Sequence, residues 1–412
     1  MSTPIELEDA ERRIAAQDLP STAVEAVDLG AADGRTLAAD LHSDGPWPAT
    51  DRSAMDGFAL ALHGEASASR EFAVVGEALA GKPFPAALRR GEAVRIMTGA
   101  VVPPGADAVA KVEDSSGFGG IEGDARRVRI LTDLAVGANI RRQGSEIDGG
   151  AKVLSRGCRL SPAEIGVLAV LGEVHVPVFV APRVAIVSTG DEVVDVGAVP
   201  LPHQVRDSNS HALAAQCRAR GAEAMRLGIA PDDEAGLRGF LTRGLSADVL
   251  ITIGGVSKGT HDLVHGTLAA LGVREIFHGV KLKPGKPTFF GRCDRDGRST
   301  FVFGLPGNPA STFTTFELFV APLLTRMLGG AAVRASARLR GAPPPSDARQ
   351  QAIPARLRTD DEGRLWATLA AVRPSGDPFG LTGADALALV PARATLAEGD
   401  LLRVVPLRPS FS

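Results

Sequence analysis

The pattern of hydrophobic and polar residues is clearest between residues 183 and 329. There, nearly continuous apolar, β-branched runs alternate with helical segments. This alternation predicts a largely parallel sheet that is covered by helices on both faces. The expected strands are 183–190, 224–230, 248–255, 273–282, 288–290 and 300–305, and the expected helices are 209–221, 232–245, 261–272 and 308–328. Gly221 is a candidate C-cap for the first of these helices.

Shorter elements flank this section on both sides. Residues 48–139 contain β-like pieces that are separated by Gly, Pro and Asp turns, and they follow an expected helix at 5–18 and short strands at 22–41. Another helix is expected near 161–171. Beyond 330, a hairpin that turns at 360–363 and a final strand predict a small all-β domain.

Composition narrows the class of protein and its partners. With 412 residues, 44% of them hydrophobic, the chain is long enough for roughly two to four domains. A net charge of −3, only 4% aromatic residues and no tyrosine argue against a nucleic-acid partner. No apolar run is long enough to span a membrane, and the polar, acidic start lacks a secretory signal, so we expect a cytoplasmic protein. Three widely spaced cysteines favour neither a disulfide framework nor a CxxC zinc site.

Four loops follow expected strands of the α/β section, and the carboxyl ends of such strands meet at one rim. They are STGDE (188–192), GGVSKGTHD (254–262), KPGKP (283–287) and GLPGNPAS (304–311). Glycines let a ligand approach the backbone, and amides at helix starts favour anions. Asn308 and Pro309 also form an ordinary N-cap and first-turn pair, so the last loop has a structural interpretation as well.

The KPGKP loop holds two lysines, Lys283 and Lys286, on either side of a Pro-Gly pair. This order favours a type II turn with Pro284 second and Gly285 third. Two ammonium groups on a stiff turn suit an oxyanion such as phosphate, and a solvated surface turn is the alternative. The loop is not a Walker A motif, because the first glycine of that motif would fall on a valine and Pro287 stands where Ser or Thr is required.

Acidic residues accompany these lysines at 191, 192, 262 and 232–233. Carboxylates beside a polyanion commonly hold Mg²⁺. Asp232 also has a structural interpretation, as the N-cap of the helix that follows it. His261 and His265 stand four residues apart, as in a zinc motif, but the sequence offers no third ligand.

Three further strings lie in the N-terminal half. Residues 48–60 (PATDRSAMDGFAL) carry Asp51 and Asp56, residues 95–109 (RIMTGAVVPPGADAV) carry Thr98, and residues 139–147 (NIRRQGSEI) place two arginines before a glycine turn and Glu146. Turn chemistry is a sufficient explanation for each string taken alone.

Together, these strings resemble the molybdopterin molybdenumtransferase family, which includes bacterial MoeA and the E domains of gephyrin and of its plant counterpart. The resemblance is carried, in the family's order and over roughly residues 48–320, by DRSAMDGFA, RIMTGAVVPPGADAV, GANIRRQGSEI, STGDEV, DSNS, GGVSKG..D, KPGKP and GLPGNPAS.

The resemblance implies a multidomain α/β plus β fold in an L-shaped subunit. It implies a linker domain (1–47 and 140–180), a β-rich domain (48–139), a MogA-like doubly wound α/β domain (181–329) that binds molybdopterin, and a C-terminal β-barrel (330–412). It also implies a homodimer in which the β-rich domain completes the partner's active site. The substrates would be adenylylated molybdopterin and molybdate, with Mg²⁺ as cofactor and AMP as product. The molybdopterin adenylyltransferase is a further possible partner.

The resemblance also assigns roles to individual residues. The implied catalytic residues are Asp51, Asp56, Thr98 and Glu146 from the partner subunit, with Glu192, Asp232 and Lys286. The implied substrate contacts are Ser188, Thr189, Gly190, Gly254, Gly255, Ser257, Lys283, Lys286, Pro306, Gly307, Asn308, Pro309 and Ser311. The implied metal ligands are Asp191 and Asp262.

The chain departs from the family pattern in two places. Gly144-Ser145-Glu146 replaces Gly-Glu-Asp, and Gly380 and Asp385 stand at later Ser and Asn positions, which leaves a molybdate contact there and a role for Arg373 open. A catalytically weakened paralogue or a scaffold protein of the same family therefore stays an alternative. An adenylylating enzyme built on the same α/β domain is a further one, although it would not need the 48–60 string.

Overall fold

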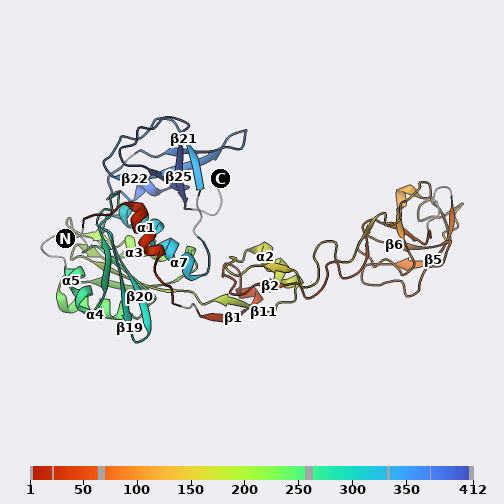
Figure 1. Cartoon of the computed structure of the whole chain (residues 1–412), viewed down its shortest axis with the longest axis horizontal. Coiled ribbons are helices and arrows are strands. Elements are labelled where there is room, and N and C mark those ends of the chain that lie inside the picture. Colours follow the sequence, from red (N-terminus) through yellow and green to blue (C-terminus); the bar gives the residue numbers. More distant parts are fainter. Residues whose placement is uncertain are drawn as a thin grey trace. The chain divides into compact units, whose positions relative to one another are not determined.

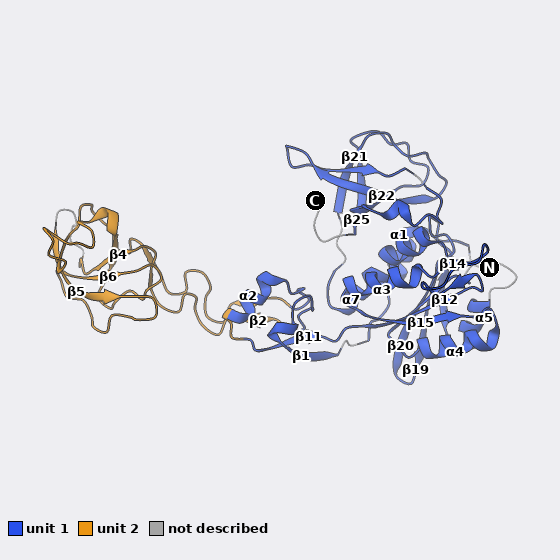
Figure 2. Ribbon diagram, turned by 180° about the vertical axis from the view of Figure 1, so that it is seen from behind, with its two compact units in different colours: residues 1–39, 156–169, 173–412 blue, residues 40–155, 170–172 orange. Residues whose placement is uncertain are grey.

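The computed structural model describes residues 3–20, 23–63, 70–255, 263–331, 335–371 and 373–407. Its chain divides into two compact units (Figure 2). The first comprises residues 1–39, 156–169 and 173–412, and the second comprises 40–155 and 170–172. The division into four domains is finer than this one and stays a prediction. Within the described residues, no helix is long and apolar enough to cross a membrane.

A six-stranded sheet forms the centre of the first unit (Figure 1). Its strands, in spatial order, are β15 (Glu223–Ala230), β12 (Arg183–Thr189), β16 (Val249–Ile253), β20 (Arg298–Leu305), β19 (Phe289–Arg295) and β17 (Arg274–His278). The first four strands run parallel, and β19 runs antiparallel to both of its neighbours. The expected parallel sheet is therefore confirmed, with an antiparallel addition at one edge.

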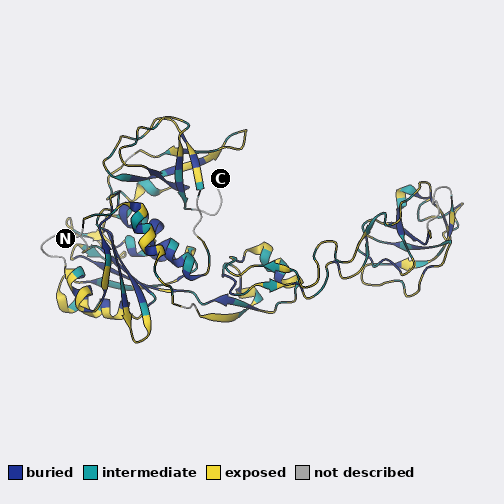
Figure 3. Ribbon diagram, in the orientation of Figure 1, coloured by how far each residue is buried: buried dark blue, intermediate teal, exposed yellow. Residues whose placement is uncertain are grey.

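Helices cover both faces of this sheet, as the sequence predicts. Val184 and Ile186 of β12 belong to one buried cluster, while Ala185 and Val187 belong to another, because successive strand side chains point to opposite faces. Figure 3 shows dark blue, buried stretches along the strands of this sheet. The first cluster includes residues of α1 (Leu7–Ala15), α3 (Asn209–Ala219), η3 (Phe316–Val320) and α7 (Ala321–Met327), and the second includes residues of α4 (Glu234–Gly244) and α5 (Leu263–Ala270).

Two expected elements of this section differ from the observed ones. The strand expected at 273–282 is split, because the chain turns at Gly279 (φ 97°) and β18 (Leu282–Lys283) then pairs with the C-terminal sheet. The helix expected at 308–328 is α6 (Pro309–Thr315), the π-helical turn η3 and α7. Pro322 has no N–H group to continue the α-helical bonding, which explains the interruption. Gly221 ends α3 with a positive φ of 80°, as expected.

The C-terminal sheet closes into a five-stranded barrel. Its strands are β21 (Ala335–Arg340), β22 (Gln350–Thr359), β23 (Leu365–Leu369), β24 (Ala386–Val390) and β25 (Leu401–Pro406), with the short helix η4 (Phe379–Leu381) between β23 and β24. The order β22-β23-β21-β25-β24 is completed by a second pairing between β22 and β24. Strands β22 and β23 form the hairpin expected around residues 360–363.

The rest of the chain is built from short elements. They are β1 (Val24–Asp28), η1 (Leu29–Ala31), β2 (Leu41–His42), β10 (Lys152–Leu154), α2 (Pro162–Val170) and β11 (His175–Phe179), with β13 (Val193–Val194) and β14 (Val205–Arg206) in a loop of the first unit. Strand β1 pairs with β11, and β2 pairs with β10. Helices α1 and α2 confirm the helices expected at 5–18 and 161–171.

The second unit is mostly β-structure, as its turn-rich sequence predicts. Its five-stranded sheet has the order β7-β4-β6-β5-β8. The strands are β4 (Gly57–Leu60), β5 (Glu71–Ala78), β6 (Glu92–Ile96), β7 (Ala108–Lys111) and β8 (Arg127–Arg129), and η2 (Val112–Asp114) follows β7. A separate pair joins β3 (Arg52–Ser53) to β9 (Ile140–Arg141).

Candidate functional site

The carboxyl ends of the parallel strands bring the expected loops together. Ser188 of β12 is opposite Ile253 of β16, and Ile253 is opposite Leu305 of β20. The Thr189 hydroxyl donates a hydrogen bond to the Ile253 carbonyl at 3.0 Å, and the Gly254 amide donates to the Leu305 carbonyl at 3.0 Å. The loops 188–192, 254–262 and 304–311 therefore begin side by side on one rim, as the sequence predicts. The fourth loop, KPGKP, does not follow a strand of this sheet as expected, because β18 before it pairs with β22 of the C-terminal sheet.

The loop after β16 needs glycine for steric reasons. Gly255 has a φ of 62°, and a Cβ atom on it would lie 2.4 Å from Cγ2 of Val264 in α5. A side chain at this position would push the loop away from the helix. Ser257, His261 and Asp262, which continue this loop, lie outside the described residues.

Two aspartates from neighbouring loops face each other at the rim. The Asp191 amide donates to a carboxylate oxygen of Asp232, and the Asp232 amide donates to a carboxylate oxygen of Asp191, both at 3.3 Å. The N-cap interpretation of Asp232 is wrong: Asp233 is the N-cap of α4, and its carboxylate accepts the Gly236 amide at 2.8 Å. Asp232 is exposed, and its hydrogen bonds hold it at the rim next to Asp191.

Glu192 adds a third exposed carboxylate at this rim. Its side chain folds back over Gly190, where an added Cβ atom would lie 2.5 Å from a carboxylate oxygen of Glu192. Gly190 (φ 124°) therefore gives the carboxylate the room to lie against the backbone of its own loop.

A buried aspartate supports the rim, in a role that the sequence did not reveal. Asp207, 4% exposed, accepts hydrogen bonds from the Ser188 hydroxyl (2.9 Å) and from the amide and hydroxyl of Ser210 (3.0 and 2.6 Å). Asn209 donates to the Gly307 carbonyl at 2.6 Å. The DSNS string (207–210) therefore connects the loop that begins at Ser188 to the loop that contains Gly307. Ser188 and Thr189 are buried, and their hydroxyls stabilise the rim through hydrogen bonds to Asp207 and to the Ile253 carbonyl.

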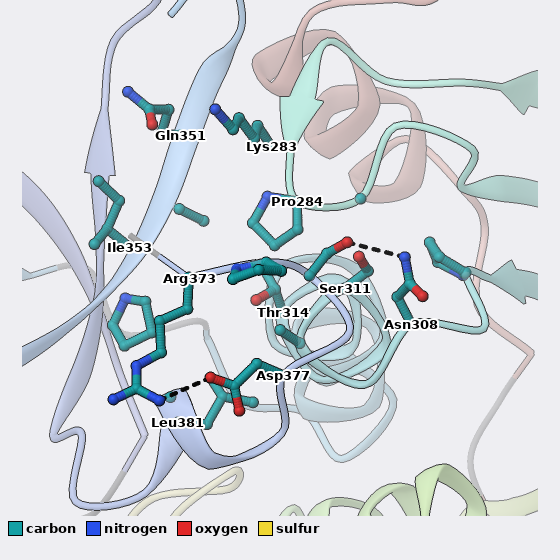
Figure 4. Close-up of a pocket in the computed structure, with 18 of the residues that line it drawn as sticks. Lys283, Pro284, Asn308, Ser311, Thr314, Gln351, Ile353, Arg373, Asp377 and Leu381 are labelled. Atoms are coloured by element: carbon teal, nitrogen blue, oxygen red, sulfur yellow. Dashed lines mark hydrogen bonds and ion pairs between the residues drawn. The ribbon is translucent and has the colours of Figure 1, made fainter. Parts of the chain in front are cut away.

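A cavity of about 350 Å³ lies between the KPGKP and GLPGNPAS loops and the barrel (Figure 4). Four cationic side chains line it, which are Lys283, Lys286, Arg349 and Arg373. Pro306, Asn308 and Ser311, which the resemblance assigns to substrate binding, line it as well. Arg349 could not be predicted from the sequence, because it lies in a barrel loop remote in sequence from every recognised string.

The KPGKP loop is not the expected type II turn. Strand pairing between β18 and β22 keeps the chain extended as far as Lys283, and the hydrogen-bonded turn is centred on Lys286 and Pro287. The Lys283–Pro284 bond is cis, and Gly285 has a φ of 121°. A Cβ atom on Gly285 would lie 2.6 Å from Cγ2 of Thr315, so the loop packs tightly against α6.

The two lysines of this loop have different surroundings. The Lys283 ammonium group donates to Asp347 at 2.7 Å, and this hydrogen bond is the main reason why the pKa of Asp347 is lowered. Lys286 is exposed, and within the described residues no carboxylate pairs with it. Lys286 is therefore the lysine of this loop whose charge is open to a ligand.

The loop after β20 contacts the segment that carries the family departures. Asn308 is the N-cap residue of α6, with Pro309 in the first turn, but its side chain makes no capping bond and instead donates to the Ser375 hydroxyl at 2.9 Å. Arg373 lines the cavity and pairs with Asp377 at 2.9 Å (Figure 4). Arg373, whose role the sequence left open, is therefore part of the cavity wall.

The two residues of the C-terminal departure from the family pattern, Gly380 and Asp385, occupy different places. Gly380 lines the cavity. Asp385 is 4% exposed inside the barrel, where it accepts the Leu357 amide at 2.9 Å. The Asp385 carboxylate therefore holds barrel strands together and does not line the cavity.

In the second unit, three recognised strings meet. Arg52 of β3 pairs with Arg141 of β9 and bridges to Val101, and its guanidinium group donates to the Gly99 carbonyl at 2.7 Å. These contacts join the strings 48–60, 95–109 and 139–147, which are far apart in the sequence.

The four acidic and hydroxyl residues assigned to this unit lie in that junction. Asp56 accepts hydrogen bonds from the Thr98 amide (2.6 Å) and hydroxyl (2.7 Å), which lower the pKa of Asp56. Asp51 pairs with Arg142 at 2.6 Å, and Glu146 pairs with Arg141. Asp56, Thr98 and Glu146 are exposed, so they form a polar surface on this unit.

Comparison with known proteins identifies the family. Residues 5–172 match the MoeA N-terminal region (domain I and II), and residues 185–326 match a probable molybdopterin binding domain. The molybdopterin molybdenumtransferase of Nostoc sp. is 38% identical over 75% of this chain and 70% of its own length. The chain belongs to the MoeA family. The Bacillus subtilis member is 34% identical over 79% of this chain and 75% of its own length.

Solved structures agree with this assignment. A crystal structure of the MoeA protein from Pyrococcus horikoshii has a TM-score of 0.80 at 30% identity, and it covers 99% of this chain and 100% of its own. A second structure from the same organism has a TM-score of 0.82 at 26% identity, with 98% and 100% coverage. The MoeA N-terminal match contains the polar surface of the second unit, and the other match contains the rim loops.

Proposed function

We propose that this protein is a molybdopterin molybdenumtransferase of molybdenum cofactor biosynthesis. It binds adenylylated molybdopterin and molybdate, cleaves the adenylyl link and leaves molybdenum on the dithiolene, with AMP as the second product. The observation that carries the proposal is the cationic cavity beside the KPGKP loop in a chain of the MoeA family. The proposed location of this reaction is the cytoplasm.

The cavity suits small oxyanions. Four cationic side chains and one carboxylate, Asp377, line it. Lys286 offers an ammonium group that no described carboxylate neutralises, and the Ser311 and Ser375 hydroxyls line the same walls. Molybdate and the pterin phosphate are both oxyanions, so fixed positive charges there stabilise the charge that develops as the phosphoanhydride breaks.

The rim carboxylates fit the nucleotide end of the substrate. Among the described residues, Asp191, Glu192 and Asp232 do not form a group of three ligands that could hold a metal ion by themselves. Mg²⁺ is usually held by one or two carboxylates together with substrate phosphates. The exposed carboxylate of Asp191, held at the rim beside Asp232, is available for this role. When bound there, Mg²⁺ neutralises charge on phosphate oxygens. The proposed ligands are Asp191 and Asp262.

The polar surface of the second unit also has a proposed role in the reaction. We assign Asp51, Asp56, Thr98 and Glu146 to the active site of a partner subunit in a homodimer. Hydrogen bonds hold the connections that carry them: Asp56 accepts two bonds from Thr98, and Asp51 accepts the Gln143 amide at 2.8 Å. Such preorganised groups suit the positioning of a polar substrate.

A reconstituted assay tests the proposed function. Purified protein, adenylylated molybdopterin, Mg²⁺ and molybdate should yield AMP and a cofactor that activates an apo-molybdoenzyme. Asp262→Asn should lower the rate of AMP release, and chelation of Mg²⁺ should stop it. AMP release that is unaffected by Asp262→Asn would refute the mechanism. No AMP at any molybdate concentration would favour the weakened paralogue or the scaffold.

A further inference from the structure

Three metal-ligating side chains meet on the face of the sheet that α4 and α5 cover. They are His265 of α5 and Glu275 and His278 of β17, and their ligand atoms all lie within 4.8 Å of one another. The His265 Nε2 atom is 2.9 Å from Oε2 of Glu275. The two imidazole rings stack with centroids 5.4 Å apart and planes 29° apart. The catalytic proposal above uses none of these residues.

A strand irregularity creates this cluster. In a regular strand, residues 275 and 278 would point to opposite faces. Here the register with β19 shifts between Glu275 and Phe277, because Glu275 is opposite Gly291 and Phe277 is opposite Phe290. This bulge brings Glu275 and His278 to the same face. The sequence indicates His265 but no third ligand, since a bulge in strand pairing is not visible in the order of residues.

The donor set is chemically specific. Two imidazole nitrogens and one carboxylate oxygen suit Zn²⁺ and related divalent first-row metals, whereas Mg²⁺ prefers oxygen ligands only. Ligand atoms around tetrahedral Zn²⁺ lie about 3.3 Å apart, given Zn–N distances of about 2.05 Å. Small side-chain rotations would close the present separations to that value, because the backbone already places all three residues together.

The surroundings of these three side chains favour a structured binding site over a chance cluster at the surface. His278 is 7% exposed, and the rings of both histidines pack edge-on against Phe289 at 5.5 and 5.9 Å between centroids. The His265 and Glu275 side chains are 38% and 35% exposed, so an ion can enter from solvent. His278 is thus a buried ligand that packs against an aromatic ring, whereas His265 and Glu275 are reached by solvent. This arrangement suits a site that takes up a metal ion from solution.

The cluster lies at the same end of the sheet as the rim loops. His278 is opposite Phe289, Phe289 is opposite Gly304, and Gly304 is opposite Thr252. This row directly precedes the loops at 254 and 306. An ion bound to His265 and to β17 would therefore connect α5, which follows the predicted GGVSKG loop, to the edge of the sheet.

We propose that His265, Glu275 and His278 form a binding site for a divalent transition-metal ion, with Zn²⁺ as the best match. The site is separate from the Mg²⁺ ligands of the reaction in both residues and donor chemistry. Its role is to fasten the start of α5 to β17, and so to hold the substrate rim in shape. Three protein ligands leave one coordination position for water or another small ligand.

Metal binding by the full-length protein tests the proposal without any activity assay. Chelator-treated protein is dialysed against Zn²⁺ in excess Mg²⁺, and the bound zinc is measured. The wild type should retain one equivalent more than His265→Gln and Glu275→Gln, with affinity at least about tenfold lower in the variants. Zn²⁺ should also raise the Tm of the wild type alone. His175→Gln is the control, since it breaks a histidine–carboxylate pair with Asp28 (3.1 Å) for which the described residues offer no third ligand.

Two results would overturn the proposal. One is equal zinc retention by the wild type and both variants, and the other is a wild-type Tm that Zn²⁺ leaves unchanged. Should a variant fold poorly, Co²⁺ substitution of the wild type replaces it as the test. A visible spectrum of low-coordinate Co²⁺ with nitrogen ligands supports the site, and a spectrum of octahedral Co²⁺ with oxygen ligands alone contradicts it.

Discussion

At the residue scale, Lys283 and Lys286 show how the fold separates two residues that look equivalent in the sequence. Both line the cavity, but the Asp347 carboxylate neutralises the Lys283 ammonium group, whereas no described carboxylate pairs with Lys286. The sequence predicted a pair of oxyanion-binding lysines. It could not predict the difference, because Asp347 approaches from the barrel, over 60 positions away.

Lys286→Ala should abolish most activity at little cost in stability. Removing a charge that stabilises the developing oxyanion is expected to lower kcat on the order of 100-fold. The free energy of unfolding should change by no more than about 0.5 kcal/mol, because the side chain is exposed. AMP release and urea denaturation measure the two effects. Lys281→Ala, which breaks a surface pair with Glu6, is the matched control; losses of similar size in activity and stability would contradict the assigned role.

Asp347→Asn should strengthen molybdate binding. The substitution removes the carboxylate that competes for Lys283 and keeps an oxygen for the Arg349 amide, which Asp347 now accepts at 3.0 Å. A partly exposed pair of this kind is worth up to about 1 kcal/mol, so the KM for molybdate should fall by up to about fivefold. Steady-state kinetics at varied molybdate would show this, and a raised KM would indicate that Asp347 orients Lys283 towards the anion.

The same pair has a defined pH dependence. Lys283 lowers the pKa of Asp347 in the folded state, so the pair's stabilising contribution is present above the ordinary aspartate pKa. It is lost only as the pH falls through the lowered pKa of Asp347. The molybdate KM of the wild type and of Asp347→Asn should therefore converge in acid and differ near neutral pH.

At the element scale, packing between neighbouring elements determines the shape of the site. The KPGKP loop is set by the β18–β22 pairing before it and by α6 beneath it. The strands and helices themselves were predictable, since their apolar patterns are local. The turn type, the split of the 273–282 strand and the bulge in β17 were not, because each depends on a partner strand that is distant in sequence.

Gly285→Ala should damage the loop through steric contact with α6. Its Cβ atom would lie 2.6 Å from Thr315, and the backbone φ of 121° is unfavourable for alanine. We expect a loss of about 1–3 kcal/mol in unfolding free energy, together with a loss of activity. Gly297→Ala is the control: it shares a positive φ (73°) but meets nothing within 4 Å. Chemical denaturation of both variants tests this, and equal small losses would show that the loop adapts.

At the scale of the whole molecule, the active site is proposed to need two subunits. Cavity residues lie in the first unit, while Asp56 and its neighbours lie in the second. A mixture of two inactive variants, Lys286→Ala and Asp56→Ala, should then recover activity. Random exchange makes about half of the dimers mixed, each with one intact site, so about a quarter of wild-type activity is expected.

AMP release after subunit exchange measures this recovery. Each variant assayed alone under the same conditions is the control. Absence of recovery, despite exchange shown by mass analysis of the mixed dimers, would place both sets of residues in the same subunit. A protein that stays monomeric would rule out the shared site altogether.

The sequence by itself determined the strand–helix order of the α/β section, the barrel hairpin, the convergence of the rim loops and the family. These follow from local apolar periodicity, from turn residues and from strings whose chemistry is encoded in consecutive positions. Only the tertiary structure decided that Asp233 and not Asp232 caps α4, that Asp207 braces the rim, that Asp347 neutralises Lys283 and that His265 meets Glu275 and His278. The last three depend on side chains brought together from separate elements or on a bulge in strand pairing, which leave no signal in the order of residues. The first depends on the contact between Asp232 and Asp191, which holds Asp232 at the rim while the next residue caps the helix.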